Sequence, residues 1–168
     1  SPDGRTVAAG WADGSRRLWS VTTGTLVAES LHEAHPIQSL WHGGATVRSL
    51  CKEGCLRSWT PERDDHALIE IHVTAAAFGD RVTALATQET LVVQVGGESW
   101  IADEYFESPI RRLALSPDGL LLAAAGALRP VRLFDLSGRR ALTELDRLFW
   151  PTALHFTPDG RLLVTQSA

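Results

Sequence analysis

The two cysteines are the most reactive side chains of this sequence, and only a short polar segment separates them. Cys51 and Cys55 flank residues 52–54, which end in a glycine that favours a tight turn. Across such a hairpin the two thiols could form a disulfide or provide half of a zinc site. A structural zinc site needs four ligands, however, and the sequence has no second pair of cysteines. We therefore expect two buried thiols and no bound metal.

The other residues with catalytic or metal-binding chemistry show no spacing typical of an active site. Asp64, Asp65 and His66 are adjacent, but they lie in a polar stretch between strand-like segments, where we expect a solvated loop. The nucleophile elbow Gly-x-Ser-x-Gly, the zinc motif His-Glu-x-x-His and a glycine-rich phosphate loop before a helix are all absent. The glycine pair at 96–97 lacks the lysine of a phosphate loop and is interpreted as a bulge or turn. The sequence thus predicts neither an enzyme nor a cofactor.

The composition is that of an ordinary soluble domain. The net charge is −4 at pH 7, and 44% of the residues are hydrophobic. This balance argues against a nucleic-acid partner. In the arginine pairs at 16–17, 111–112 and 139–140, alternation along a strand would send one side chain of each pair into solvent, so these pairs are interpreted as ordinary surface charge. No apolar run approaches the roughly 18 residues of a membrane-spanning helix, so no membrane partner is expected. Arginine far outnumbers lysine, which favours a bacterial source, and we expect a cytoplasmic location.

Turn residues recur along the chain at intervals of about 40 residues. The first stretch shows the unit: a Pro-Asp-Gly turn, a strand over 6–11, a second turn at 13–14 and a returning strand over 16–21. An aromatic residue stands near the end of the returning strand as Trp19, Trp59 and Phe134. Such a unit leaves no room for a helix. The equivalent turns lie at 2–4, 42–44, 78–80, 117–119 and 158–160.

Each unit is expected to hold four short strands. In the second unit the strands are predicted at 37–41, 46–51, 55–59 and 67–72. Some strands elsewhere, such as 90–95 and 120–125, are apolar on both faces. That pattern is typical of sheets that are covered on both sides, as when small sheets stack on one another around an axis. The predicted fold class is therefore all-β.

These features resemble the WD-repeat β-propellers. The resemblance rests on the spacing, on the Pro-Asp-Gly turns and on the segments VRLFDLSG (131–138) and SRRLWSVTTG (15–24), and it covers essentially the whole chain. It implies a β-propeller fragment of about four blade equivalents, each a four-stranded antiparallel sheet. Because the sequence lacks methionine and opens inside a turn, we expect a piece of a larger WD-repeat protein. The implied blades are 1–35 (partial, from its second strand), 36–72, 73–108, 109–147 and 148–168 (first two strands).

The resemblance also assigns structural positions within the repeat. The aspartate that follows the aromatic residue is present as Asp135 and is replaced by Ser20 and Thr60 in other units. His35 stands in for the family's histidine before the first strand. The Ser/Thr-His-Asp-Trp hydrogen-bond network of the family is therefore incomplete in every unit. The positions assigned in this way are Asp13, Trp19, His35, Trp59, Asp118, Phe134, Asp135 and Asp159.

A partner-binding rim follows from the same resemblance. In the family, the loops from fourth to first strands and from second to third strands lie on one rim, where many partners dock. Aromatic and arginine side chains concentrate the energy of interfaces. We therefore predict that Trp11, Tyr105, Arg129 and Trp150 bind a protein or peptide. The alternative for Trp150 is that it fills the gap between neighbouring blades.

Three functional hypotheses remain open at this point. The first is an interaction scaffold or sensor, which could be the regulatory arm of a larger multidomain signalling protein. The second is part of a propeller enzyme of the hydrolase type, with a site in the central channel. The third is a structural array with no dedicated ligand. The lack of catalytic motifs favours the first hypothesis, with a protein or peptide as the partner.

Overall fold

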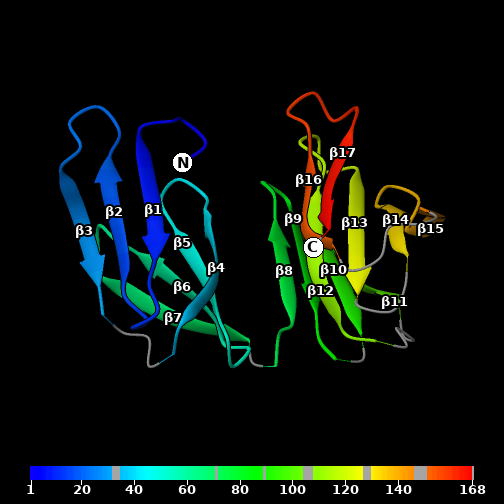
Figure 1. Ribbon diagram of the computed structural model, residues 1–168, viewed down its shortest axis with the longest axis horizontal. Helices are drawn as coiled ribbons and strands as arrows, with labels where there is room; N and C mark the ends of the chain where they lie inside the picture. The colour runs from blue at the N-terminus through cyan, green and yellow to red at the C-terminus, as the bar shows by residue number, and fades with distance from the viewer. Residues whose placement is uncertain are drawn as a thin grey trace. The chain divides into compact units, whose positions relative to one another are not determined.

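The computed structural model describes residues 1–31, 35–70, 72–88, 90–103, 108–126, 130–145 and 151–167. Within these residues the chain forms seventeen strands and no helix. The strands make five antiparallel sheets of two to four strands, and none of these sheets closes into a barrel or a propeller (Figure 1). The prediction of an all-β chain of small antiparallel sheets is confirmed. The chain divides into two compact units, Ser1–Val73 and Thr74–Ala168.

The first unit contains two sheets. The first sheet has the order β1-β2-β3, and the second has the order β4-β5-β6-β7. Within each sheet consecutive strands pair with one another, so the connections inside a sheet are hairpins. The strands are β1 Thr6–Gly10, β2 Arg16–Ser20, β3 Leu26–Ser30, β4 Ile37–His42, β5 Val47–Cys51, β6 Leu56–Thr60 and β7 Asp65–Glu70.

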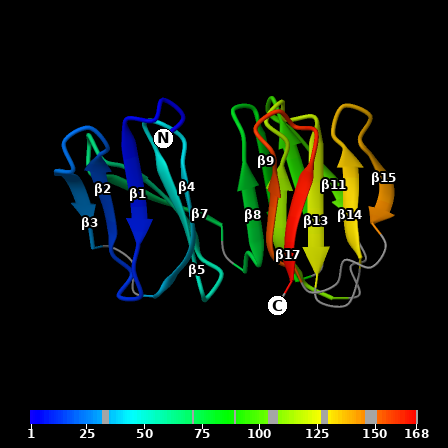
Figure 2. The same cartoon turned by 45° about the horizontal axis from the view of Figure 1, so that its top comes forward.

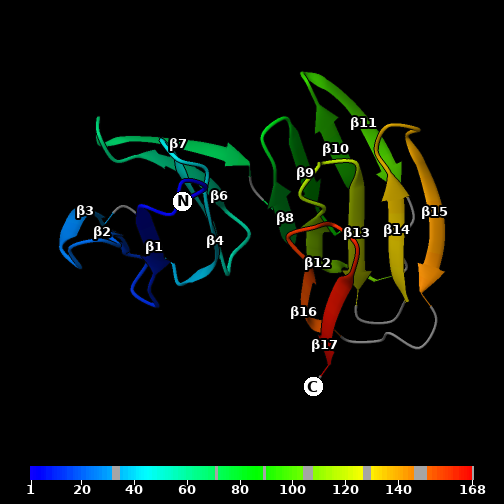
Figure 3. The same ribbon diagram turned by 90° about the horizontal axis from the view of Figure 1, so that it is seen from above.

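The second unit contains three sheets built in the same way. The third sheet joins β8 to β11, the fourth joins β12 to β15, and the fifth is the hairpin of β16 and β17. Seen from above, the fourth sheet lies between the other two (Figure 3). The strands are β8 Ala75–Phe78, β9 Val82–Ala86, β10 Leu91–Val95, β11 Glu98–Asp103, β12 Ile110–Leu115, β13 Leu121–Gly126, β14 Val131–Asp135, β15 Arg140–Leu145, β16 Pro151–Phe156 and β17 Leu163–Ser167.

One predicted loop of the second sheet is in fact the start of a strand. The solvated loop expected at Asp64 to His66 is wrong, because β7 begins at Asp65, which pairs with Thr60 of β6. The chain turns more tightly than the sequence suggested, since Asp64 adopts a positive φ of 48° and closes the turn itself. The side chain of His66 is consequently only 16% exposed.

The core of the first unit lies between its two sheets. Leu18 of the first sheet packs with Val47 and Trp59 of the second, and all three are buried. Ala8 and Leu40 complete the contact. Leu18 and Trp59 are large and are 6% and 1% exposed, so this small cluster supplies much of the apolar burial that holds the two sheets together.

The core of the second unit has two layers, one on each face of the fourth sheet. One layer packs Leu122 and Phe134 against Leu91 of the third sheet. The other packs Ala123 against Leu154 of the fifth sheet. Strand β13 is accordingly buried at nearly every position. Of the two apolar runs predicted to be covered on both faces, the run at 120–125 is covered in this way, whereas the prediction for 90–95 is wrong, because only alternate residues of β10 are buried.

The Pro-Asp-Gly turns share one hydrogen-bond pattern. The hydroxyl of Ser116 donates to Oδ1 of Asp118 at 2.5 Å, and the same carboxylate accepts the Leu120 N–H at 3.0 Å. The Ser116 oxygen in turn accepts the Leu121 N–H at 2.8 Å. The turns at 1–6 and 157–162 repeat these bonds. The recurring sequence therefore encodes a recurring, self-contained turn.

Candidate functional site

A cavity of the first unit is bordered by three turns and by residues of β2 and β3. It has a volume of about 510 Å³, within the range of pockets that hold small ligands or side chains. The turn before β1, the β4–β5 turn and the β6–β7 turn surround it, and the first two of these lie at the same end of the sheets in Figure 2. We call it the first cavity. Its lining residues are Ser1, Asp3, Arg5, Thr6, Leu18, Val27, Ala28, Gly44, Ala45, Pro61 and Glu62.

The first cavity has an apolar interior and a charged mouth. Leu18 at its base is also part of the core between the sheets, while Ala45 and Pro61 come from the turns. Asp3 and Glu62 are exposed at the mouth. A cavity of this kind can receive an apolar side chain and contact polar or charged groups beside it.

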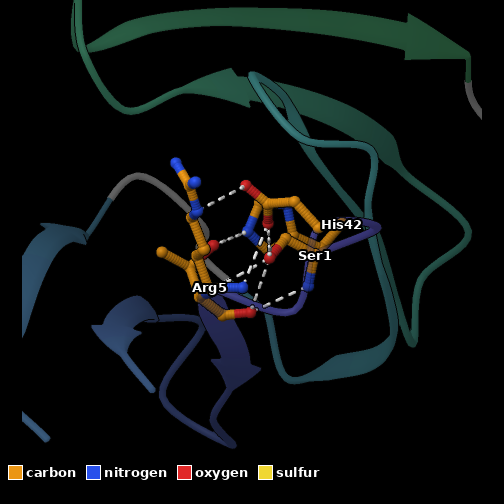
Figure 4. Close-up of polar contacts among 5 residues, drawn as sticks. Ser1, Arg5 and His42 are labelled. Carbon is orange, nitrogen blue, oxygen red and sulfur yellow. Dashed lines mark hydrogen bonds and ion pairs between the residues drawn. The ribbon is translucent and has the colours of Figure 1, made fainter. Parts of the chain in front are cut away.

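A hydrogen bond joins the two sheets next to the first cavity. Thr6 of β1 and His42 of β4 approach to 2.7 Å between Oγ1 and Nε2. Figure 4 shows His42 close to Ser1 and Arg5, which belong to the turn that lines the cavity. Partial burial lowers the pKa of His42, so the ring is neutral at neutral pH. This contact fixes the turn before β1 against the second sheet.

The mouth of the first cavity carries an ionised aspartate that is held in place. Oδ1 of Asp3 accepts the Ser1 hydroxyl at 2.6 Å and the Arg5 N–H at 3.1 Å. The hydroxyl bond, followed by the backbone bond, lowers the pKa of Asp3 below its ordinary value. The Arg5 guanidinium lies 3.9 Å from the other carboxylate oxygen. The orientation of this carboxylate is thus set by the turn and not by a bound partner.

A buried arginine crosses between the same two sheets. Arg16 of β2 is fully buried, and it donates to the hydroxyls of Ser30 and Ser49, each at 3.1 Å. It also lies 3.1 Å from Nδ1 of His66 and 5.5 Å from the centre of the Trp59 ring. The alternation expected for this arginine pair is present, because Arg17 is the partly exposed residue and Arg16 is the buried one. The Arg16 side chain points between the sheets, while Arg17 on the opposite face pairs with Glu29 at 2.5 Å.

The arginine fixes the protonation pattern of His66. A guanidinium can only donate hydrogen bonds, so Nδ1 of His66 must accept from Arg16. The proton of the neutral ring then lies on Nε2, which is 3.1 Å from Oδ1 of Asp64. The ring also stacks on Trp59. Residues of the four types in the family's Ser/Thr-His-Asp-Trp network thus lie near one another in the second sheet, as Ser49, His66, Asp64 and Trp59. They are arranged around Arg16, which no repeat motif indicated.

Of the four residues predicted to bind a partner, only Trp11 lies within the described residues. Tyr105, Arg129 and Trp150 lie outside them. The Trp11 ring is half-buried, 5.4 Å from the ring of Trp19 and 4.7 Å from the guanidinium of Arg17. It lies at the end of β1 opposite to the first cavity. The assignment of these four residues to a binding surface therefore stays a prediction.

The predicted structural positions occupy turns and sheet interiors. Asp13 accepts the Ser15 N–H at 2.9 Å, which closes the β1–β2 turn. Asp135 accepts from the hydroxyl and backbone of Ser137, and these bonds lower the pKa of its carboxyl. Asp118 and Asp159 hold the turns described above. Trp59 and Phe134 are buried, Trp19 is half-buried, and His35 is exposed.

The cysteines lie together as predicted, but only one is fully buried. Cys51 is buried, Cys55 is half-buried, and the Cys55 N–H donates to Sγ of Cys51 at 3.2 Å. Among the described residues no disulfide joins them. Nor does any group of three or more His, Cys, Asp and Glu side chains within those residues come close enough to hold a metal ion.

The second unit has a cavity in a comparable place. It measures about 390 Å³ and lies between the β8–β9 turn and the β12–β13 turn, which belong to neighbouring sheets. We call it the second cavity. Its lining residues are Phe78, Gly79, Asp80, Arg81, Val82, Leu115, Ser116, Pro117, Asp118 and Gly119. Neither cavity was predicted, because alanine, proline and glycine in turns give no sequence signal for a binding site.

Comparison with known proteins shows a likeness of fold and no likeness of sequence family. No family model matches the chain, and no curated protein matches it. The computationally designed Ika8 protein matches 98% of the chain with a TM-score of 0.75 and 20% identity, and the chain spans about half of Ika8 (53%). The computationally designed Ika4 protein matches 78% of the chain with a TM-score of 0.64 and 20% identity, over 85% of its own length. No helix long and apolar enough to cross a membrane occurs in the described part of the chain.

Proposed function

We propose that the chain provides blades of a WD-repeat-like β-propeller and acts as a binding module for a protein or peptide. The second, third and fourth sheets would be complete blades, each with its four strands in sequence order. The first and fifth sheets, with three and two strands, would be parts of others. The recurring Pro-Asp-Gly turn and the likeness to Ika8 support this arrangement.

The observation that carries the binding function is the first cavity. It combines an apolar base, Leu18, with exposed carboxylates at its mouth. The bond between Thr6 and His42 and the buried Arg16 both hold its two walls together. Because these walls are ordered before any ligand arrives, little conformational entropy would be lost on binding. We therefore place the binding site at the turn end of the sheets and not beside Trp11.

A peptide selection with two matched variants tests this proposal. Peptides are selected from a displayed random library on the 168-residue chain, and their affinities are then measured by fluorescence anisotropy. Ala45→Trp should block the first cavity and weaken the selected peptides at least tenfold. Ala12→Trp places the same bulky residue on an exposed position of the β1–β2 turn, at the other end of β1, and should leave binding unchanged.

Two outcomes would contradict the proposal. The first is a selection in which no peptide is enriched over an unrelated control protein. The second is a set of peptides that bind the Ala45→Trp variant as tightly as they bind the original chain, because those peptides would use another surface. In both variants the far-ultraviolet circular dichroism should match that of the unchanged chain, since both substituted residues are exposed in turns.

A further inference from the structure

The first and second cavities are both bordered by turns from two adjacent sheets. The first is bordered by the β4–β5 turn and by the turn that leads into β1 of the neighbouring sheet. The second is bordered by the β8–β9 turn and by the β12–β13 turn of the neighbouring sheet. Each therefore lies where adjacent sheets end in turns near one another. Because a cavity of this kind occurs in both units, the chemistry of the two linings can be compared.

Both cavities offer apolar surface of side-chain size. In the first, Leu18 and Pro61 provide this surface. In the second, Phe78, Val82 and Leu115 do so. Val82 is buried and Phe78 and Leu115 are half-buried, so the apolar wall of the second cavity is continuous with the core of its unit. A side chain that enters either cavity would leave water for hydrocarbon.

The two cavities also carry the same set of side-chain charges. Asp3, Glu62 and Arg5 line the first cavity. Asp80, Asp118 and Arg81 line the second. Each set has two carboxylates and one guanidinium, and the Ser1 α-ammonium adds a second cation to the first cavity, so only the second cavity has a net negative charge. All six residues are exposed, so the charges lie in reach of a ligand.

The carboxylates keep their charge and position without a ligand. The Ser1 hydroxyl holds Asp3, and the Ser116 hydroxyl holds Asp118, in both cases through Oδ1. In the second cavity a guanidinium nitrogen of Arg81 lies 3.3 Å from the place a Cβ on Gly96 would take, which puts this cation over the β10–β11 turn. Glu62 of the first cavity and Asp80 of the second are exposed, so a cation from outside can reach their carboxylates.

We propose that each cavity accepts an apolar side chain of an extended peptide whose neighbouring residue is lysine or arginine. The apolar side chain enters the hollow, and the cation meets the carboxylate of Glu62 at the first cavity or of Asp80 at the second. This inference rests on the proposed peptide-binding function and adds the chemistry of the partner. An acidic neighbour would instead face two carboxylates of the same sign.

A nuclear magnetic resonance titration with three capped hexapeptides tests the inference. The peptides are Gly-Ser-Leu-Lys-Ser-Gly, Gly-Ser-Leu-Gln-Ser-Gly and Gly-Ser-Ser-Lys-Ser-Gly, added to the 15N-labelled 168-residue chain. The Leu-Lys peptide should shift the amide signals of Gly44 and Ala45 and those of Gly79 and Gly119. It should bind about two- to fivefold more tightly than the Leu-Gln peptide, as expected for one exposed ion pair. The Ser-Lys peptide should cause no shift at either cavity.

Charge-removing variants locate the preference. Glu62→Gln should abolish the advantage of lysine at the first cavity and leave it at the second. Asp80→Asn should do the reverse. Glu53→Gln removes an exposed carboxylate from the β5–β6 turn, at the other end of the second sheet, and should change neither.

The possible failures of the inference and of the proposed function are distinct. If the Leu-Lys and Leu-Gln peptides bind equally at both cavities, or if the preference survives in Glu62→Gln and Asp80→Asn, the chemistry inferred for the partner is wrong while peptide binding stands. If neither these peptides nor any library-selected peptide shifts the amide signals of the residues at the two cavities, both the proposed peptide-binding function and the inferred partner chemistry are wrong.

Discussion

Replacing the buried Arg16 with methionine should destabilise the first unit by about 2–3 kcal/mol. The substitution removes three hydrogen bonds, to Ser30, Ser49 and His66, each 3.1 Å long. Bonds to a charged group contribute about 1.5–3 kcal/mol each, so their loss costs roughly 4–5 kcal/mol at the low end. Methionine restores part of the packing, and the chain no longer has to remove a guanidinium from water, which offsets several kcal/mol. We expect the hydrogen-bond loss to be the larger effect, because the Ser30 and Ser49 hydroxyls stay buried and lose a bond to a charged donor.

Urea denaturation followed by tryptophan fluorescence measures this effect. Trp59 lies 5.5 Å from the guanidinium and is buried, so its emission reports on the contact between the two sheets. The midpoint for Arg16→Met should fall by about 1 M. Arg17→Met is the matched control: it removes a partly exposed arginine that pairs with Glu29, and should cost no more than about 1 kcal/mol. If Arg16→Met unfolds at the same urea concentration as the unchanged chain, or at a higher one, the buried arginine does not hold the sheets together.

Two further substitutions test the turns and the sheet contact. Hydrogen bonds, first from the Ser116 hydroxyl, lower the pKa of Asp118 below its ordinary 3.8. The ionised carboxylate therefore stabilises the fold fully above pH 3.8, and this stabilisation is lost as the pH falls through the lowered pKa. Asp118→Asn should reduce the dependence of the melting temperature on pH between about pH 2 and 5, and an unchanged dependence would contradict this role of Asp118. Gly10→Ala should destabilise the first unit by about 1–3 kcal/mol in the same urea assay, because a Cβ there would lie 2.5 Å from Cγ2 of Ile37 in the neighbouring sheet. Gly43→Ala, where the nearest atom would be 3.7 Å away, should stay within about 0.5 kcal/mol, and equal effects of the two changes would refute the close approach.

The strands and turns of this chain could be predicted because their signals are local. The Pro-Asp-Gly turn satisfies its own hydrogen bonds within six residues, so the same residues fold the same way at each occurrence. Strands such as β13 are marked by a continuous apolar run. Strand β7 was misplaced by two residues at its start, because a non-glycine residue, Asp64, adopts the positive φ that ends the turn.

The interior polar contacts could not be predicted because they are not local. Arg16 meets Ser30 from its own sheet but Ser49 and His66 from the next one, and no spacing in the sequence marks that meeting. A pair of arginines at 16–17 alternates across a strand, so one of the two must face each side of the sheet. Which face of the first sheet is covered depends on where the second sheet packs. The two arginines themselves do not determine that packing.

The position of the candidate site follows from how the two ends of the first sheet are used. At the end that carries Trp11, the aromatic surface is already in contact with Trp19 and Arg17, so a partner would have to displace these contacts to reach it. At the opposite end, the turns satisfy their own hydrogen bonds and leave Leu18 at the base of a hollow. A ligand at that end gains apolar contact without breaking an existing one. For this reason we place the proposed binding site at the turns that border the first cavity and not beside Trp11.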